Sequence, residues 1–586
     1  MCGIFGFASL AQKSSSMVLN GLKRLEYRGY DSWGIVVEKN GKLLIDKHIG
    51  KIGQAKTNLP SSTIGLGHTR WATHGGVTQA NAHPHLDCTR SLALVHNGII
   101  ENYDTLKKRL TGRHKFASQT DTEVAVHMIE DLKKTNSFVS AVRKAFVQFE
   151  GLNAIIAIDS LDKTLVLAKT GSPLILGFGK GENFIASDSA CLLEHTRQVY
   201  FIDDGQMAVI KADKVQVLEL KSGKPINFKK QTIDWTLEET QKGKFDHFML
   251  KEIYEQPRII RNIAANNHRQ INALSQLIKK SVGTYLVACG SAAYAAICAT
   301  YLFSKIAKRH LNFSYGSEFG YTLDFINSQS LVIALSQSGE TIDIIDSVKK
   351  AKKRGAKIAA LVNVLGSSLY RLADFKVLLT AGPEKAVAST KAFIAKIANL
   401  LMLAYAFTKY PADGRDLLDK SADEVDRLLM PENIQKIKKL ADLVAAKSDI
   451  YAIGRGISYP IALEATLKIK EVSYIHAEGF AAGELKHGFI ALVEKGTPCI
   501  VFLPNDETYG ATMAGAMEVK ARGGFIIGIS AKNHEVFDYF IPVSDCAEAT
   551  VIPNTVVSQL LAYFLSVKKG IDPDKPRNLA KSVTVK

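Results

Sequence analysis

The chain has 586 residues, of which 46% are hydrophobic and 22% charged, which is the composition of an ordinary globular protein and excludes a disordered one. This length is too great for one hydrophobic core, so about three or four domains are expected. The formal net charge is +17, but the basic residues are spread over amphipathic helices without interleaved aromatics, which favours a solvated surface over nucleic-acid binding.

Membrane and disulfide signals are missing from the sequence. No run reaches the eighteen or so apolar residues of a membrane helix, and the N-terminus does not resemble a secretory signal, so we expect a cytoplasmic protein without a membrane partner. The seven cysteines are scattered and never spaced as Cys-x-x-Cys, which argues against a disulfide framework and against a zinc ribbon.

The first 230 residues read as short apolar strands separated by Gly, Asp and Ser turns. We expect helices near residues 16–25 and 122–133, and strands at 92–95, 154–158, 165–168, 174–177 and 207–211. This pattern is typical of stacked antiparallel sheets flanked by helices. The polar, aperiodic stretch 231–245 that follows is predicted to be a linker.

After this stretch the chain alternates strand, loop and helix, and the alternation occurs twice. The strands expected at residues 284–288, 331–335 and 358–362 are matched by strands at 449–453, 499–503 and 525–529. The pattern predicts two copies of one doubly wound parallel α/β domain. Only the first copy has a hydroxyl-rich loop after its second strand, so one anion site is expected, in that copy.

Cys2 directly follows the initiator methionine, and removal of that methionine would give Cys2 both a thiol and an α-amine. Such an amine has a pKa of about 7.7–8.0 and accepts a proton near neutral pH, so it suits a nucleophile that has no separate histidine partner. For a lone cysteine, a buried small hydrophobe is the more common alternative.

Three further segments, 68–75, 96–100 and 120–123, decide between these alternatives. Together with residues 27–32 they resemble the glutaminase domain of the N-terminal-nucleophile amidotransferases, an α-β-β-α sandwich. The resemblance implies that Cys2 forms a γ-glutamyl thioester and that Asn97 and the N–H of Gly98 form the oxyanion hole. It also implies that Trp71 closes the ammonia route, and that glutamine is bound by Arg70, Trp71, Thr73, His74 and Asp121.

A metal site is the alternative interpretation of the histidines in this region. His83-Pro84-His85 invites it, but no third ligand stands at a convincing spacing, so no metal is expected. Trp33 departs from the small residue usual in the resembled family, which leaves the packing of that loop open.

The loop Ser336-Gln337-Ser338-Gly339-Glu340-Thr341 joins an expected strand to a helix. A serine N-cap would explain one hydroxyl, but several around a glycine favour a phosphate at the helix N-terminus. Here the chain resembles the sugar isomerase (SIS) domain family, and the segment 387–391 matches another of its substrate loops. The resemblance implies a sugar-phosphate site of Ser291, Ser336, Gln337, Ser338, Thr341, Val387, Ser389 and Ala580, with departures at Ala292 and Ala386.

The second copy contains Glu464, Lys468 and Glu471 on one helical face. The usual explanation of such a pattern is a solvated charged stripe. The segments that follow it, 473–478 and 482–488, favour an active site instead. These segments and the tail 575–586 resemble the glutamine–fructose-6-phosphate aminotransferase family. The resemblance implies that Glu471 moves a proton between two sugar carbons, that Lys468 and Glu464 assist, and that His487 opens the ring. It also implies that Lys581 forms a Schiff base and that Arg577 and Ala580 line the path between the sites.

This resemblance spans nearly the whole chain. It implies transfer of the glutamine amide nitrogen to fructose 6-phosphate with isomerisation to glucosamine 6-phosphate, no cofactor, and a homodimer in which His487 enters the neighbouring site. We expect a glutaminase domain at 1–230, the linker at 231–245, sugar isomerase domains at 246–425 and 426–570, and a catalytic tail at 571–586. A fructosamine phosphate deglycase and a non-catalytic sugar-phosphate sensor remain alternatives.

Overall fold

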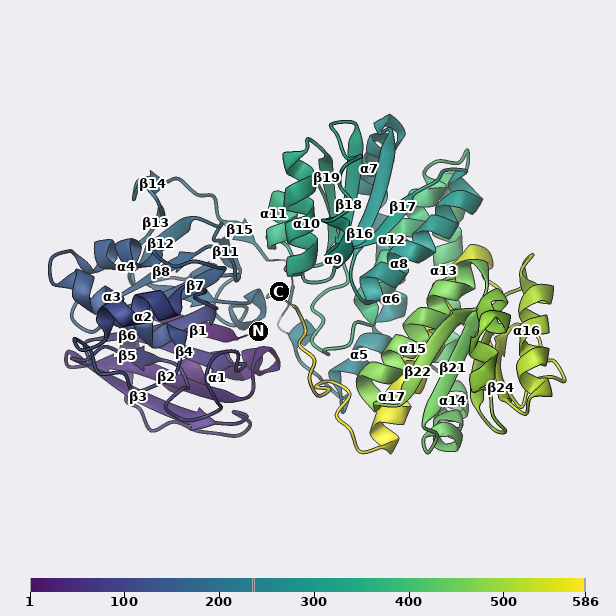
Figure 1. The fold of residues 1–586 in the computed structure, drawn as a ribbon, viewed down its shortest axis with the longest axis horizontal. Helices are drawn as coiled ribbons and strands as arrows, with labels where there is room; N and C mark the ends of the chain where they lie inside the picture. Colours follow the sequence, from purple (N-terminus) through teal and green to yellow (C-terminus); the bar gives the residue numbers. More distant parts are fainter. Residues whose placement is uncertain (1, 234, 237, 584–586) are drawn as a thin grey trace. The chain divides into compact units, whose positions relative to one another are not determined.

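The computed structural model describes residues 2–233, 235–236 and 238–583. The chain divides into two compact units (Figure 1). The first is built chiefly from residues 2–240, and the second from Gln241–Leu365 and Leu369–Lys581.

The first unit contains two antiparallel sheets, as its turn-separated apolar runs predict. The eight-stranded sheet has the order β15 (Gln231–Thr232), β11 (Gln198–Phe201), β9 (Ile175–Phe178), β10 (Glu182–Ala186), β1 (Gly3–Lys13), β4 (Ser62–Arg70), β2 (Ser32–Lys39), β3 (Lys42–Ile49). The seven-stranded sheet has the order β14 (Pro225–Ile226), β13 (Val215–Glu219), β12 (Gln206–Ile210), β8 (Thr164–Lys169), β7 (Asn153–Asp159), β6 (Leu92–Gly98), β5 (His85–Leu86). The short strand β15 lies within the stretch expected to be a linker.

Apolar side chains from both sheets form one core, which includes Ile4 and Val36 from the first sheet and Val95 and Ile156 from the second. Helix α1 (Ser16–Leu25) packs on β1 and β4, while the outer face of the second sheet is covered by α2 (Tyr103–Leu110), α3 (Asp121–Lys133) and α4 (Phe138–Phe146). The α-β-β-α sandwich is therefore confirmed. The helices α2 and α4 were not among the elements expected from the sequence.

The second unit contains two five-stranded parallel sheets. The first has the order β17 (Asn312–Tyr315), β16 (Gly283–Ala288), β18 (Ser330–Ser336), β19 (Lys357–Val362), β20 (Phe375–Leu378). The second has the order β22 (His476–Ala481), β21 (Asp449–Gly454), β23 (Pro498–Leu503), β24 (Phe525–Ser530), β25 (Tyr539–Pro542). In chain order both sheets read 2-1-3-4-5, so the repeat of one doubly wound domain is confirmed. Ligands of such sheets bind beyond the carboxyl ends of the first and third strands, where the winding reverses.

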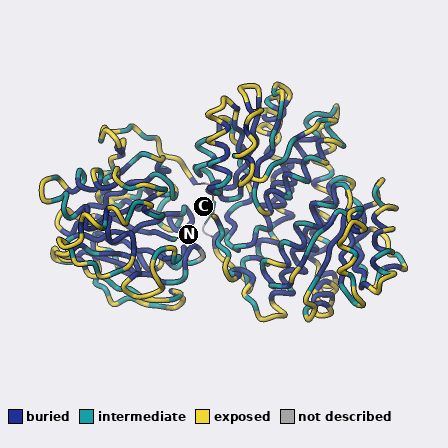
Figure 2. Tube along the Cα trace, in the orientation of Figure 1, coloured by how far each residue is buried: buried dark blue, intermediate teal, exposed yellow. Residues whose placement is uncertain are grey.

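Helices cover both faces of each sheet, which explains why central strands such as β18 are buried along their whole length. The helices of the first copy are α5 (Phe248–Tyr254), α6 (Gln256–Asn266), α7 (His268–Lys280), α8 (Ser291–Leu302), α9 (Gly316–Phe319), α10 (Ile342–Lys353), α11 (Ser368–Leu372) and α12 (Lys391–Tyr405). They are followed by α13 (Pro411–Leu428), α14 (Pro431–Val444), α15 (Tyr459–Ser473), α16 (Tyr509–Ala521) and α17 (Val551–Lys568). Because α8 packs on α15 and α12 packs on α17, the two copies share one apolar core. Figure 2 shows that buried residues predominate in the interior of the second unit and exposed residues at its periphery.

One helical segment, Ala547–Lys568, is long and apolar enough to cross a membrane by length and composition. Within the fold, 89% of its apolar window is buried, mainly against α13, α14 and α15. It therefore serves as a core helix of the second unit.

Candidate active sites

Cys2 lies at the start of β1, where the ends of β1, β4 and β6 converge. The N–H of Gly3 donates to Thr69 Oγ1 at 3.0 Å, which ties the start of the chain to β4. The Cys2 sulfur accepts the N–H of Trp71 at 3.3 Å. Burial raises the pKa of the Cys2 thiol, while the Trp71 hydrogen bond acts in the opposite direction. A nucleophile held here needs a proton acceptor before it can react, and the α-amine of a chain that starts at Cys2 would supply one.

The two expected oxyanion donors end β6 beside Cys2. Asn97 donates from Nδ2 to the Cys2 carbonyl at 3.1 Å, and its own amide oxygen lies 3.1 Å from His68 Nε2. His68 Nε2 also lies 3.0 Å from the carbonyl of His96. Burial lowers the pKa of His68 to about 3, so the ring is neutral and its Nε2–H holds the Asn97 amide in one orientation.

Gly98 adopts a φ of +133°, a conformation that side-chain-bearing residues rarely take. A Cβ atom built at this position would lie 2.2 Å from the Leu152 carbonyl oxygen. Glycine is therefore required if the N–H of residue 98 is to stay in place beside Asn97.

The residues expected to bind glutamine surround Cys2 on β4, on the loop after it and at the start of α3. Arg70 is 3% exposed and donates to the carbonyls of His74, Gly75 and Gly76, so it shapes this loop. Burial lowers the pKa of Arg70, and the charges of Cys2, Asp31 and Asp121 oppose that shift.

Asp121 is the acidic member of this set. It is buried and accepts the N–H of Ile100 at 2.8 Å. Trp71 lies edge-on to Tyr30 at 5.3 Å, and the His74 ring packs on Tyr103 at 4.3 Å. Thr73 is exposed on the same loop. The fold therefore brings a buried cation and a buried anion to the nucleophile, which suits the two charged ends of an amino acid.

The hydroxyl-rich loop lies where the winding of the first parallel sheet reverses, between β18 and α10. Ser336 Oγ accepts the N–H of Gly339 at 3.0 Å and lies 3.2 Å from Thr341 Oγ1. Ser338 Oγ accepts the N–H of Glu340 at 3.1 Å, and Gly339 turns the chain with a φ of +66°. These hydrogen bonds fix the hydroxyls at the N-terminal end of α10, where the helix dipole favours an anion.

Ser291 and Ser389 extend this site from two other elements. Ser291 begins α8, directly beyond β16, and its hydroxyl donates to Glu464 of the second copy at 3.0 Å. The hydroxyl oxygen of Ser389 is buried and makes no hydrogen bond within the described part of the chain, so it remains available to a ligand. Val387 donates its N–H to the Asp574 carbonyl at 3.0 Å, which joins this loop to the C-terminal tail.

The charged face of α15 is buried at Glu464 and Lys468, which excludes the alternative of a solvated stripe. Lys468 is fully buried, forms an ion pair with Glu471 and lies 3.6 Å from Glu464. Burial raises the pKa of Glu464 to about 7, against the opposing charge of Lys468. Burial alone would lower the pKa of Lys468, but the two carboxylates raise it. A carboxyl group that titrates near neutrality can both donate and accept a proton during turnover.

Lys581 reaches back from the tail to the first copy. Its ammonium donates to Glu384 Oε2 at 2.6 Å and to the Ala386 carbonyl at 2.7 Å. Glu384 Oε1 also accepts the N–H groups of Thr390 and Ala392 at the start of α12. Burial alone would raise the pKa of Glu384, but Lys581 and the N–H of Ala392 lower it to about 2.

Sequence reasoning missed Glu384, and it missed Lys396 as well. Lys396 is buried on α12, and burial lowers its pKa to about 8. The charges of Glu384, Lys581, Glu464 and Lys468 all act on this pKa, so tail, first copy and α15 form one charged neighbourhood. Glu384 stands only five residues before Ser389, and this closeness to the expected substrate loop is the one signal in the sequence that could have indicated it.

Three expected residues lie outside this neighbourhood or at its edge. His487 is exposed at the end of a 3₁₀ turn (Ala482–His487) and takes no part in the hydrogen bonds of the charged neighbourhood. Arg577 stacks over the Tyr474 ring at 4.3 Å, and its N–H donates to the Tyr474 hydroxyl at 2.6 Å. Ala580 is half-buried beside Lys581.

The three departures from the resembled families have clear environments. Trp33 is buried in β2 and stacks on His48 at 4.5 Å. Ala386 donates its N–H to Glu252 at 3.2 Å and accepts from Lys581, so its backbone forms the contacts at that position. Ala292 is buried in the first turn of α8 and leaves Ser291 as the hydroxyl there.

The fold and these two sites define a glutamine amidotransferase joined to a tandem sugar isomerase module. Residues 68–194 match the model of the glutamine amidotransferase domain, and residues 277–406 and 442–539 match that of the SIS domain. The chain is 43% identical to a glutamine–fructose-6-phosphate aminotransferase (isomerizing) of Thermococcus kodakarensis and 42% identical to one of Pyrococcus horikoshii, each over the full length of both chains. The chain belongs to the glutamine–fructose-6-phosphate aminotransferase (isomerizing) family.

A solved structure gives the same result for the second unit. The C-terminal domain of glucosamine-fructose-6-phosphate aminotransferase from Francisella tularensis covers 57% of this chain and 99% of its own length. The two are 33% identical, with a TM-score of 0.53. The expected family and fold class are thereby confirmed.

Proposed function

We propose that this protein transfers the amide nitrogen of glutamine to fructose 6-phosphate and isomerises the product, giving glucosamine 6-phosphate and glutamate. The observation that carries the proposal is the charged neighbourhood of the second unit, where Lys581, Glu384 and the Glu464–Lys468–Glu471 face lie around a loop with an unpaired Ser389 hydroxyl. The printed names of the full-length relatives support the same reaction.

In the glutaminase step the Cys2 sulfur attacks the side-chain amide carbon, and ammonia leaves as a γ-glutamyl thioester forms. Asn97 and the Gly98 N–H stabilise the oxyanion, because they donate where negative charge develops. Water then cleaves the thioester and releases glutamate. Arg70 and Asp121 bind the α-carboxylate and α-amine, with Trp71, Thr73 and His74 completing the site. Trp71 and Arg577 line the proposed ammonia route.

In the sugar step His487 opens the ring, and the Lys581 amine attacks C2 of the open-chain ketose. Water leaves and a Schiff base forms. Ammonia then displaces the Lys581 amine from C2. Glu471 removes a proton from C1 and returns one to C2, which yields the aldose, while Lys468 and Glu464 stabilise the charge that moves during this transfer.

The phosphate of the sugar would be held by Ser336, Gln337, Ser338 and Thr341, with Ser291, Val387, Ser389 and Ala580 around the sugar itself. We assign the glutaminase step to residues 1–230, a linker to 231–245, sugar binding to 246–425, isomerisation to 426–570 and Schiff-base formation to the tail 571–586. The scheme needs no cofactor. We further propose a cytoplasmic homodimer, because the exposed His487 would complete the site of a second copy.

A deglycase has no use for a glutamine-cleaving nucleophile, and a sensor has no use for buried Lys468 or Lys581. Retention of both features, together with the names of the relatives, disfavours these two alternatives.

The proposal is tested by a mass balance. Purified protein is incubated with glutamine and fructose 6-phosphate, and glutamate and glucosamine 6-phosphate are followed together. We expect equal amounts of both, and loss of both in Cys2→Ala. Lys581→Ala should abolish the amino sugar while binding of fructose 6-phosphate, measured by calorimetry, stays near normal. Undiminished synthesis in Lys581→Ala would refute the assignment of the Schiff base to Lys581. Release of glutamate without formation of amino sugar would refute fructose 6-phosphate as the acceptor.

A further inference from the structure

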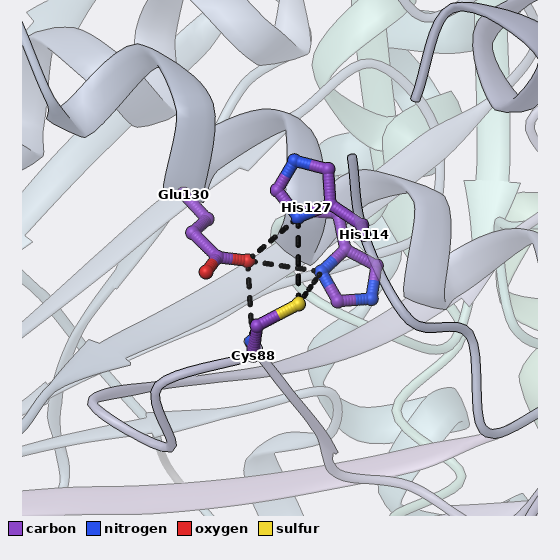
Figure 3. Close-up of side chains that lie close together, drawn as sticks. All are labelled: Cys88, His114, His127 and Glu130. Atoms are coloured by element: carbon purple, nitrogen blue, oxygen red, sulfur yellow. Dashed lines mark hydrogen bonds and ion pairs between the residues drawn. The ribbon is translucent and has the colours of Figure 1, made fainter. Parts of the chain in front are cut away.

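A second constellation of reactive side chains lies in the first unit, among residues that the proposed reaction does not use (Figure 3). Cys88 stands in the turn between β5 and β6, and His114 lies in the segment between α2 and α3. His127 and Glu130 project from α3. One ligand atom from each of the four residues lies within 4.8 Å of all the others.

The distances between these atoms are those of a coordination shell. Cys88 Sγ lies 3.5 Å from His114 Nδ1 and 3.7 Å from His127 Nδ1. Glu130 Oε2 lies 3.0 Å from the Nδ1 atoms of both histidines. Zinc bonds of about 2.3 Å to sulfur and about 2.0–2.2 Å to nitrogen or oxygen, at tetrahedral angles, place sulfur about 3.6 Å from nitrogen and nitrogen about 3.3 Å from oxygen. These four distances differ from that geometry by about 0.3 Å or less, and all four ligand atoms lie within 4.8 Å of one another.

The far side of each imidazole faces a carboxylate. His114 Nε2 lies 3.1 Å from Asp131 Oδ1, and His127 Nε2 lies 3.7 Å from Glu123 Oε1. Histidines that bind a metal through one nitrogen commonly direct the other nitrogen at a carboxylate, which fixes the ring and the tautomer. Neither Nε2 atom makes a hydrogen bond within the described part of the chain, but each lies near a carboxylate, while both Nδ1 atoms are directed at the same point.

Burial divides the cluster into a closed and an open side. The side chains of His114 and His127 are 2% and 1% exposed, and that of Glu130 is 11% exposed. Cys88 is exposed. An ion can therefore enter from the side of Cys88, and once bound it would be shielded by the two histidines and α3.

We propose that Cys88, His114, His127 and Glu130 form a structural Zn²⁺ site. One thiolate, two imidazoles and one carboxylate are a ligand set that zinc accepts, and four protein ligands leave no open position for catalysis. On binding, Cys88 would lose its thiol proton to solvent. This site was not expected from the sequence, which suggested no metal.

The bound ion would stabilise the approach to the glutamine site. It would join the 87–91 turn and the 111–120 segment to α3, whose first residue is Asp121. Glu123, which faces His127, also accepts the N–H groups of Ala117 and Ser118 at 2.6 and 2.7 Å. The metal would therefore hold the segment that delivers Asp121. This consequence rests on the proposed glutaminase function, whereas zinc binding does not.

The test is the metal content of the full-length protein. Protein purified with zinc and dialysed should retain about one zinc per chain by elemental analysis, and cobalt added to chelator-treated protein should show thiolate-to-metal absorption. Cys88→Ser should abolish the thiolate-to-cobalt absorption. His114→Gln should abolish the retention of zinc. Asp131→Asn should weaken zinc binding about 10- to 100-fold, as loss of an outer carboxylate does.

Two controls keep the result specific. His268→Gln removes an exposed histidine outside the cluster, and Cys2→Ala removes the other reactive thiol; both should leave zinc content unchanged. Circular dichroism and thermal unfolding check that the first unit, which contains the cluster, is folded in each variant. The proposed site would be overturned if the wild type retained no zinc. It would also be overturned if Cys88→Ser showed the same zinc content and the same cobalt absorption as the wild type. Either result would count against the site even if glutamine hydrolysis were confirmed.

Discussion

Replacing Gly98 by alanine tests whether the second oxyanion donor is held in place by the lack of a side chain. The new Cβ would lie 2.2 Å from the Leu152 carbonyl oxygen, whereas ordinary contacts are 3.4 Å or longer. Residue 98 or its neighbour must therefore move by about 1 Å, a misplacement that costs a catalytic group about 10²-fold. The positive φ adds about 1–3 kcal/mol of strain to the folded protein.

The assay is glutamate release from glutamine, and we expect kcat to fall about 100-fold with a smaller change in KM. Gly205→Ala is the matched control, because Gly205 also has a positive φ, +79°, but a Cβ there meets no atom within 4 Å. It carries the same kind of backbone strain and should keep its glutaminase rate. Binding of fructose 6-phosphate should be unchanged in both variants.

Two results would refute the reasoning. A Gly98→Ala enzyme with a normal glutaminase rate would show that the N–H of residue 98 does not stabilise the oxyanion. An equal loss in Gly205→Ala would assign the effect to backbone strain in the first unit and not to the displaced donor.

Further predictions concern a positioning residue, a substrate hydroxyl and a buried acid. His68→Phe should lower the glutaminase kcat about 10-fold, because it releases the Asn97 amide. In an Asn97→Ala background the same change should cause no further loss of kcat. Additive losses in the double variant would contradict the role of His68 in positioning Asn97. Ser389→Ala should raise the KM for fructose 6-phosphate about 10-fold, the value of one hydrogen bond, and leave glutamine hydrolysis intact, whereas an unchanged KM would exclude the contact. Because burial raises the pKa of Glu464 to about 7, the contribution of this acid to stability is fully present below about pH 4 and is lost as pH rises through 7, when the buried acid ionises. Glu464→Gln should therefore gain about 3 kcal/mol more over wild type at pH 8 than at pH 4, measured by urea unfolding and by hydrogen exchange in α15, and a pH-independent difference would contradict the burial argument.

Much of the fold follows from local pattern. The strands around residues 284–288, 331–335 and 358–362 were predicted within a residue at either end, because a buried parallel strand is a continuous apolar run ended by a polar loop. Helices α2 and α4 were missed: α2 is short and mostly polar, and both lie among strand-like runs that dominated the pattern.

The candidate sites divide in the same way. Cys2, the Ser336–Thr341 loop and the Glu464–Glu471 face were predicted, because each is a compact segment whose residue types and spacing suggest a chemistry. Whether the Glu464–Glu471 face was solvated or buried could not be decided from spacing, since burial depends on α8 and α17, which come from distant parts of the chain.

Sequence by itself determined the family, the repeat and the short motifs, because each can be identified from runs of consecutive residues without knowing which residues are neighbours in space. Only the tertiary structure placed Glu384 under Lys581, joined Ser291 to Glu464 and gathered Cys88, His114, His127 and Glu130 around one point. Each of these groupings draws on segments far apart in the chain or on several different elements. Their chemistry depends on distances between atoms, and those distances are set by packing rather than by spacing along the sequence.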